Sequence, residues 1–390
     1  MAPRRWISAL SVVFALAGCT STTAPGPTPP PPGSSPGTSS SEPRPSPGAA
    51  LASGAALPTG CDGVRPRRSQ TVAFVAEGRA WALDPSGFDL TCMFQVDEAA
   101  PFAWGPQGDR VLLGGMEIRG VGAHPASLAA TGAQPAAWDW GHPLGLSVVF
   151  AEGDRRLPEK RFMDDGHVER LPTMPAGVYL DIAYHPSGHA LAVAIQQHGE
   201  QSIWISTNEG TDPVPLVHSE GGTRFPSIAF SPDGERLLWI AQHLNTYQVH
   251  EMDLRDRTGF DDGWRGELDE EATNLHLAPE GDLMALDVGI TCDERTAVAV
   301  LSPTVARPAL PDEPRPTTVV GWLDRTTLLV SAGGCDDTGD LSAVDVLDGS
   351  VTDLVRGVGL AATRTAVTDA PASVPVPAEQ APPPPPEGVG

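Results

Sequence analysis

The sequence predicts an all-β fold, a β-propeller of seven four-stranded blades that is closed by N- and C-terminal strands of one blade. Six blades are the alternative. Three observations support the prediction: a turn motif recurs along the middle of the chain, its copies are 34 to 47 residues apart, and short apolar runs flank each copy. Repeats of this length, made of short strands and tight turns, are typical of propeller blades.

The turn motif consists of a bulky apolar residue, one variable residue and then Pro-x-Gly. Its clearest copy, residues 228–239, has Phe230 followed by Ser-Pro-Asp-Gly and the run Glu-Arg-Leu-Leu-Trp. Proline sets φ at the second position of a turn and glycine accepts the left-handed conformation that ends it, so the motif predicts a tight turn between two strands. The other copies, of which those at 137 and 320 are degenerate, are 102–113, 137–148, 182–193, 275–286 and 320–330.

One bulky residue marks the same position in every copy, directly before the turn. The marker residues are Trp104, Trp138, Tyr184, Phe230, Leu277 and Trp322. Such regularity predicts that they form the core between neighbouring blades and not a platform on which sugars stack.

The two ends of the repeat region are expected to share a blade. Residues 71–76, 79–84 and 88–96 have the pattern of second, third and fourth strands, and residues 359–368 would supply the missing first strand. Pairing the ends removes an open sheet edge that would otherwise template aggregation. Six marked copies and this shared blade make seven, and six blades remain if the copy near residue 138 is an insertion.

The N-terminus has the pattern of a targeting signal. Residues 1–18 combine Arg4 and Arg5 with an apolar run that is too short to span a bilayer, and small residues precede Cys19. This order resembles the signal peptide and lipobox of bacterial lipoproteins, which implies cleavage before Cys19 and lipidation of its thiol. The resemblance implies an extracytoplasmic protein, anchored by the lipid on Cys19 to the outer leaflet of the cell membrane on the cell-wall side. An ordinary secretion signal is the alternative.

Two further segments contain too few large apolar residues to form a folded core. Residues 19–61 are the cysteine followed by Pro, Ser, Thr and Gly in low-complexity order, and residues 371–390 include five consecutive prolines. Segments of this composition bury too little apolar surface to offset the conformational entropy lost on folding, so a disordered linker and a disordered tail are predicted. A polyproline ligand for a partner domain is the alternative for the tail. The propeller is assigned to residues 62–370.

The sequence of the clearest repeat, Phe-Ser-Pro-Asp-Gly-Glu-Arg-Leu at 230–237, resembles that of the TolB-like (WD40-like) family of β-propellers. The similarity extends over essentially all of 71–370 and implies the propeller fold. It implies no particular activity, because propellers host unrelated functions.

Four cysteines remain if lipidation takes up Cys19, and an oxidising compartment would pair them in one of three ways. Cys292 and Cys335 occupy corresponding loops of adjacent repeats, so they are expected to pair with each other. Cys61 would then pair with Cys92 and tie the incoming chain to the outer strand of the first blade. On the chain-entropy model each bond stabilises the fold by about 3–4 kcal/mol. Reduced thiols are the alternative.

The charge of the chain excludes one class of partner. With 49 acidic and 25 basic residues the formal charge is −24, whereas nucleic-acid recognition requires a basic footprint. Residues 253–271 carry eight acidic and three basic residues and are expected to be a solvated loop between blades. Nucleophile-elbow, zinc-protease, P-loop and dinucleotide-binding motifs are all absent from the sequence.

No cofactor or metal is expected from these patterns. His185 and His189 flank one Pro-x-Gly turn at a blade rim, where too few ligands converge to bind a metal. Calcium at the acidic loop 336–340 is the weaker alternative, since the closing glutamate of a calcium loop has no counterpart there.

Candidate ligand-binding residues follow from propeller geometry. Loops between second and third strands gather with the connections between blades around one mouth of the central channel. The sequence places polar residues of both charge signs there, and none has the pattern of a general acid–base pair. They are Arg119, Arg155, Arg156, His198, His243, Asn245, Tyr247, Asp293, Arg295 and Asp337.

Together these features favour a cell-surface, non-catalytic binding or scaffold module for a protein or a polar cell-envelope ligand such as cell-wall glycan. The alternative is a secreted propeller enzyme, a hydrolase or lyase acting on glycan or a lactone at the channel mouth. A metal ion bound at that mouth would favour the enzyme. An accessory subunit of a membrane complex is the third hypothesis.

Overall fold

The computed structural model describes residues 57–364 with internal gaps. The signal peptide, Cys19, most of the linker and the tail therefore lie outside the described residues. The residues between 57 and 364 that are not described are 62, 87–88, 97–101, 106–109, 114–116, 122–125, 128–135, 139–146, 151–157, 163–167, 172, 208–209, 220–221, 256–263, 269, 281–282, 290–296, 303–304, 312 and 334–338.

All regular structure in the described part is β-strand, arranged in seven antiparallel sheets of four strands each. We call these sheets blades A to G and number the four strands of a blade from the inside outwards. Blade A contains β28 (Leu360–Thr363), β1 (Val72–Ala76), β2 (Arg79–Leu83) and β3 (Leu90–Gln95). Blade B contains β4 (Phe102–Trp104), β5 (Arg110–Leu113), β6 (Glu117–Gly120) and β7 (Ala126–Ser127). Blade C contains β8 (Ala136–Trp138), β9 (Ser147–Phe150), β10 (Glu159–Phe162) and β11 (Val168–Arg170).

The remaining four blades follow the same order. Blade D contains β12 (Val178–Tyr184), β13 (Ala190–Gln197), β14 (Glu200–Thr207) and β15 (Val214–His218). Blade E contains β16 (Arg224–Phe230), β17 (Arg236–His243), β18 (Thr246–Asp253) and β19 (Trp264–Leu268). Blade F contains β20 (Ala272–Leu277), β21 (Met284–Val288), β22 (Ala297–Ser302) and β23 (Val305–Pro308). Blade G contains β24 (Thr317–Trp322), β25 (Thr327–Ala332), β26 (Gly339–Asp345) and β27 (Val351–Val358).

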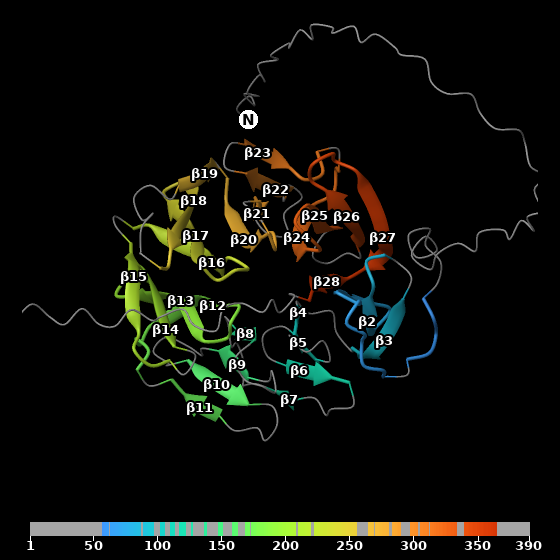
Figure 1. Cartoon of the computed structure of the whole chain (residues 1–390), viewed down its shortest axis with the longest axis horizontal. Coiled ribbons are helices and arrows are strands. Elements are labelled where there is room, and N and C mark those ends of the chain that lie inside the picture. The colour runs from blue at the N-terminus through green and yellow to red at the C-terminus, as the bar shows by residue number, and fades with distance from the viewer. Residues whose placement is uncertain are drawn as a thin grey trace, which may run out of the picture. The chain divides into compact units, whose positions relative to one another are not determined.

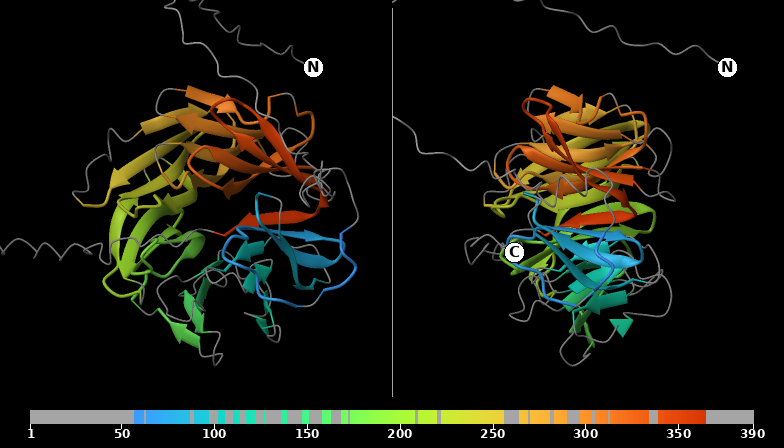
Figure 2. Two further views of the ribbon diagram at one scale, coloured as in Figure 1. Left: turned by 45° about the vertical axis from the view of Figure 1, so that its right-hand side comes forward. Right: turned by 90° about the vertical axis from the view of Figure 1, so that its right-hand side faces the viewer.

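The seven blades surround a common axis, with the first strand of each blade nearest the centre (Figures 1 and 2). The predicted propeller is confirmed, and the count is seven because the degenerate copy at 137–148 supplies first and second strands of a blade of its own, blade C. The predicted shared blade is confirmed too. β28 pairs with β1 from Val72 opposite Thr363 to Val75 opposite Leu360, so both ends of the described chain belong to blade A.

The Pro-x-Gly motif forms the turn between first and second strands, as predicted. The N–H of Gly188 donates to the carbonyl of His185, and the N–H of Gly234 donates to the carbonyl of Ser231, each at 2.8 Å. Both glycines have φ near +73°, a conformation that side chains other than glycine's disfavour. Each marker residue is the last residue of its blade's first strand.

The hydrophobic core lies between blades. Ala192 and Ile203 of blade D share one apolar cluster with Phe225 and Trp239 of blade E. Burying a side chain of this size contributes about 1.5–3 kcal/mol. The predicted interblade role is confirmed for Trp104, Phe230 and Trp322, each of which packs in an apolar cluster shared by two blades. Tyr184 is buried in a cluster formed by blade D and the connection that precedes it.

Residues 57–70, which we call the N-terminal strap, run along the outer edge of blade A. The disulfide between Cys61 and Cys92 attaches the strap to β3, which is the pairing expected from the sequence. At the end of the strap the fully buried Gln70 donates from Nε2 to the carbonyl of Ala82 at 3.2 Å and to Oγ1 of Thr91 at 2.9 Å. The disulfide and these hydrogen bonds hold the strap against blade A. Cys292 and Cys335 lie outside the described residues.

One sequence expectation was wrong in part. The acidic stretch 253–271 contains β19, the fourth strand of blade E, where a solvated loop was expected. Charge obscured the strand, because an outermost strand has one solvated edge and tolerates charged side chains that an inner strand does not. In the described part of the chain no helix has the length and hydropathy needed to cross a bilayer.

Candidate binding site at the channel mouth

The direction of the strands determines which loops share an end of the ring. First and third strands run one way and second and fourth strands the other, so the loops between second and third strands lie beside the connections that lead to the next blade. We call this end the mouth face. The opposite end, which carries the Pro-x-Gly turns, is the turn face.

Four of the predicted site residues are fully described, and all belong to hairpins of blades D and E on the mouth face. His198 lies in the turn between β13 and β14, while His243, Asn245 and Tyr247 surround the turn between β17 and β18. Arg119 lies in β6, but its side chain is not described. The predicted site residues outside the described part are Arg155, Arg156, Asp293, Arg295 and Asp337.

The hairpin of blade D ends in a two-residue turn. His198 and Gly199 have φ of 53° and 91° between the paired residues Gln197 and Glu200. Positive φ at both central residues is typical of the mirror-image turns that match the twist of antiparallel strands. The turn therefore holds the exposed His198 imidazole at a defined place on the mouth face.

The hairpin of blade E presents a leucine that the sequence analysis missed. Leu244 has φ of 56°, and its side chain is 79% exposed at the tip of the turn between His243 and Thr246. Placing a branched apolar side chain in this left-handed region costs about 1–2 kcal/mol. The signal was present in the sequence as His-Leu-Asn-Thr, because a leucine stands where a hairpin turn normally has Gly, Asn or Asp.

Polar residues flank this leucine in the chain, His243 before it and Asn245 after it. Oγ1 of Thr223 lies 3.4 Å from Nδ1 of the exposed His243. Burial raises the pKa of Tyr247, and the negative charge of Glu271 raises it further, while Arg224 opposes both effects. The buried Tyr247 phenol therefore remains protonated at neutral pH. The exposed side chains of this part of the mouth include the apolar Leu244, the imidazole of His243 and the guanidinium of Arg224.

Two carboxyl groups with strongly shifted pKa values lie between blades and not at the mouth. Asp181 of β12 accepts hydrogen bonds from the N–H groups of Ile182 at 2.9 Å and, across the seam between blades D and E, Ile228 at 2.8 Å. Asp287 of β21 accepts from the N–H of Val319 at 2.7 Å. Burial raises the pKa of each carboxyl to about 6, and these hydrogen bonds limit the rise.

Asn274 of β20 connects Asp287 to a histidine in the seam between blades F and G. Its Nδ2 donates to Asp287 at 2.9 Å and to the carbonyl of Val319 at 3.0 Å, and its Oδ1 lies 2.8 Å from Nε2 of His276. Burial lowers the pKa of His276 to about 4, so this imidazole is neutral. These groups satisfy one another and the backbone, which is a structural role.

His185 lies in the Pro-x-Gly turn after β12, where the sequence placed it, but its side chain is buried. It is 1% exposed, and its Nε2 donates across the seam to the carbonyl of Gly234 at 2.9 Å. Burial lowers its pKa, and the ring occupies the space that the missing side chain of Gly234 leaves. The neighbouring His189 is exposed, so the two histidines do not converge on one site.

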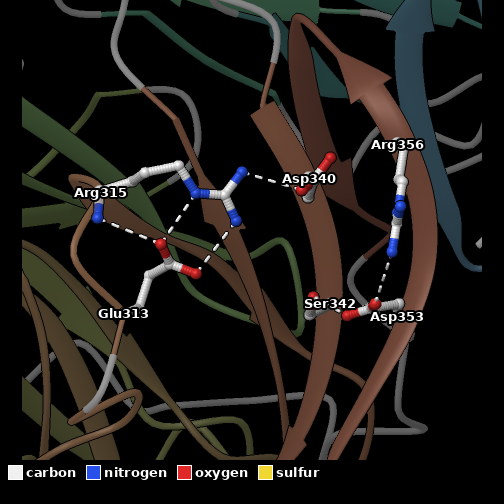
Figure 3. A network of polar contacts seen from close by, with 6 residues as sticks. All are labelled: Glu313, Arg315, Asp340, Ser342, Asp353 and Arg356. Atoms are coloured by element: carbon white, nitrogen blue, oxygen red, sulfur yellow. Dashed lines mark hydrogen bonds and ion pairs between the residues drawn. The ribbon is translucent and has the colours of Figure 1, made fainter.

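An ion network holds the connection between blades F and G (Figure 3). The guanidinium of Arg315 makes two hydrogen bonds to Glu313, of 2.8 and 3.0 Å, and a third of 2.8 Å to Asp340 at the start of β26. On β27, Asp353 accepts from Ser342 at 3.2 Å and lies 3.6 Å from Arg356. Because Arg315 is committed to two carboxylates, it positions the connection and is not available to an anionic ligand.

Among the described residues, no group of three or more His, Cys, Asp or Glu side chains could hold a metal ion. The acidic loop considered for calcium is described only from Gly339 onward. The described mouth presents one exposed apolar side chain, Leu244, between the exposed polar residues His243 and Asn245.

Neither a protein-family model nor a curated protein matches this sequence. Several solved structures are similar in fold. TolB from Acinetobacter baumannii matches 78% of this chain over 68% of its own at 12% identity and a TM-score of 0.43. A puromycin hydrolase matches 77% over 57% of its own chain at 13% identity and a TM-score of 0.50. An oligogalacturonate lyase in complex with manganese matches 65% over 79% at 11% identity and a TM-score of 0.45. At these identities the likeness concerns the fold alone.

Proposed function

We propose that this chain is a lipid-anchored β-propeller of the cell surface that acts as a non-catalytic binding or scaffold module. Its binding surface is the mouth face of blades D and E. Of the two ligand classes expected from the sequence, a protein is the partner that this surface favours.

The observation that carries the proposal is Leu244. Leu244 is an exposed aliphatic side chain at positive φ in a two-residue hairpin turn, between His243 and Asn245. Protein interfaces use such apolar anchors at their centre with a polar rim around them. A glycan ligand would instead favour an exposed aromatic ring, and Tyr247 beside Leu244 is buried.

The enzyme alternative receives less support from the same surface. A hydrolase or lyase needs a general acid and a general base within reach of one substrate. Within the described residues, the hydrogen-bond partner of His243 is the hydroxyl of Thr223. The strongly perturbed carboxyls, Asp181 and Asp287, are occupied with backbone N–H groups of the next blade.

The binding role is tested by retention of proteins from a cell-envelope extract on the purified full chain. We expect Leu244→Asp and Leu244→Gly to lose the retained partner. Leu347→Asp is the matched control, because Leu347 is a 66% exposed leucine in a turn on the opposite face. Leu244→Gly also separates binding from folding, since glycine relieves the positive φ and should stabilise the hairpin by about 1 kcal/mol. Retention of the same proteins by all variants would contradict the proposed surface.

The anchor is tested separately by Cys19→Ala. We expect the parent chain to incorporate a labelled fatty acid and to sediment with membranes, and the variant to lose both properties. A variant that remains labelled and membrane-bound would exclude lipidation at Cys19 without affecting the binding test.

A further inference from the structure

A groove opens at the outer rim of the seam between blades F and G, away from the hairpins of the proposed binding surface. Its volume is about 550 Å³, within the range of sites that bind a ligand or a peptide segment. Most of its walls are apolar and come from both blades, from the connection after β23 and from the turn between β26 and β27. The principal lining residues are Val300, Pro308, Leu310, Pro311, Val346 and Val351.

One arginine at the edge of the groove is open to a carboxylate. Arg307 of β23 is exposed there and makes no ion pair with any described residue. Of the two acidic lining residues, Glu313 is paired with Arg315, whereas Asp345 accepts the N–H of Leu347 at 2.8 Å and keeps its negative charge. An occupant would therefore be mainly apolar, with a carboxylate at the Arg307 edge and none beside Asp345.

The C-terminal segment 371–390 has this chemistry. It consists largely of Pro, Ala and Val, and its charged residues are Glu379 and Glu387. Proline restricts such a segment to extended polyproline conformations, so it loses little entropy when it lies in a groove. The linker 20–56 has one acid, Glu42, and one base, Arg44, and offers no net charge to Arg307.

The chain also leaves the propeller at a suitable place. β28 ends on the turn face of blade A, and the turn at 346–350 lies on the same face of the neighbouring blade G. The six residues 365–370 can extend over roughly 20 Å, and all 26 residues after Arg364 over roughly 85 Å. A tethered segment within reach experiences an effective concentration in the millimolar range, so a weak contact is sufficient for occupancy.

We propose that the proline-rich segment 371–390 docks in the groove between β23 and the β26–β27 turn, with a carboxylate on Arg307. The tail is then a built-in ligand of its own propeller. This inference is independent of the proposed mouth site.

The test compares the full chain with a chain that ends at Ala370, which retains every described strand. A fluorescently labelled synthetic peptide of residues 371–390 is titrated into each. We expect the peptide to bind the truncated chain and not the full chain, because the tethered copy occupies the groove. Binding to neither, or equally to both, overturns the proposal.

Two pairs of variants in the truncated chain locate the contact. Arg307→Glu should weaken the peptide about threefold to fivefold, while Arg325→Glu, at an exposed arginine of the turn in blade G, should leave binding unchanged. Val351→Asp, at a 49% exposed lining residue, should weaken it about tenfold or more, whereas Leu347→Asp, outside the groove lining, should not. Equal affinities within both pairs overturn the location.

Light scattering of the full chain tests whether the groove is occupied by the tail of a second copy of the chain. A monomer supports docking of the tail on its own propeller. A dimer that disappears on truncation at Ala370 shows that the tail occupies the groove of a second copy, which overturns the intramolecular form of the proposal.

Discussion

The seam between blades D and E and the seam between blades F and G meet the same requirement with different residues. In both, a carboxylate accepts a backbone N–H from the first strand of the following blade. At D–E the acid is Asp181 on a first strand, whereas at F–G it is Asp287 on a second strand. The position that corresponds to Asp181 in blade F holds Asn274, which contacts Asp287.

Both seams therefore contain the same kind of contact, although the acid that makes it stands at a different position of the blade. The N–H groups of Ile228 and Val319 each bond to a carboxylate of the preceding blade, and burial makes an unpaired N–H costly. Any nearby acceptor can satisfy it. The seams also differ at the turn face, where His185 bonds to Gly234 in D–E and Trp322 Nε1 donates to the carbonyl of His276 in F–G.

The largest expected effect is at the turn-face contact of the D–E seam. A Cβ at Gly234 would overlap the His185 imidazole, and φ there is +74°. We expect Gly234→Ala to lower the free energy of unfolding by roughly 3–4 kcal/mol, measured by denaturant titration. Gly199→Ala is the control, since φ is also positive but no atom lies within 4 Å, and it should cost about 1–2 kcal/mol. Equal losses would show that the His185 contact contributes nothing.

The second prediction compares the two acids directly. Asp287 is 3% exposed, and Asp287→Ala leaves the Val319 N–H and the Asn274 amide without their acceptor, at a cost of about 3 kcal/mol. Asp181 is only partly buried, so water can replace it, and Asp181→Ala should cost about 1 kcal/mol. The measurement is again denaturant titration at neutral pH. A greater loss for Asp181 would reverse the comparison.

The third prediction concerns pH. The folded-state pKa of Asp287 is raised to about 6 from an ordinary 3.8, so its contribution to stability is complete below about pH 4 and is lost as the pH rises through 6. We expect the unfolding free energy of the parent to decline by about 2 kcal/mol more between pH 4 and pH 7 than that of Asp287→Asn. Parallel pH profiles of the two proteins would exclude a raised pKa.

The smallest expected effect is at the marker residue of blade G. Trp322→Phe removes the hydrogen bond of 3.2 Å to His276 and makes this marker the same residue as Phe230 in blade E. A single neutral hydrogen bond contributes about 1 kcal/mol, so a loss of that size is expected in denaturant titration. An unchanged stability would mean that the apolar part of the ring alone holds this seam.

The fold was predictable because each blade repeats a local signal. Pro-x-Gly turns, marker residues and apolar runs are properties of a dozen consecutive residues, and they led to the preferred count of seven blades, the shared first blade and the pairing of Cys61 with Cys92. The strand β19 was missed because its sequence is charged. The candidate site was predictable only as a region, since propeller topology brings certain loops to one mouth.

The sequence alone predicted the type of blade and which loops share an end, because strand and turn preferences act over short distances, but it left six or seven blades open. The fold itself was needed to show seven sheets, the bond of His185 across a seam, the use of Asp287 in the role of Asp181, and the exposed Leu244 at a left-handed φ. These depend on which backbone groups and side chains of different blades face one another. Residues far apart in the chain set that proximity, and the local repeat does not encode it.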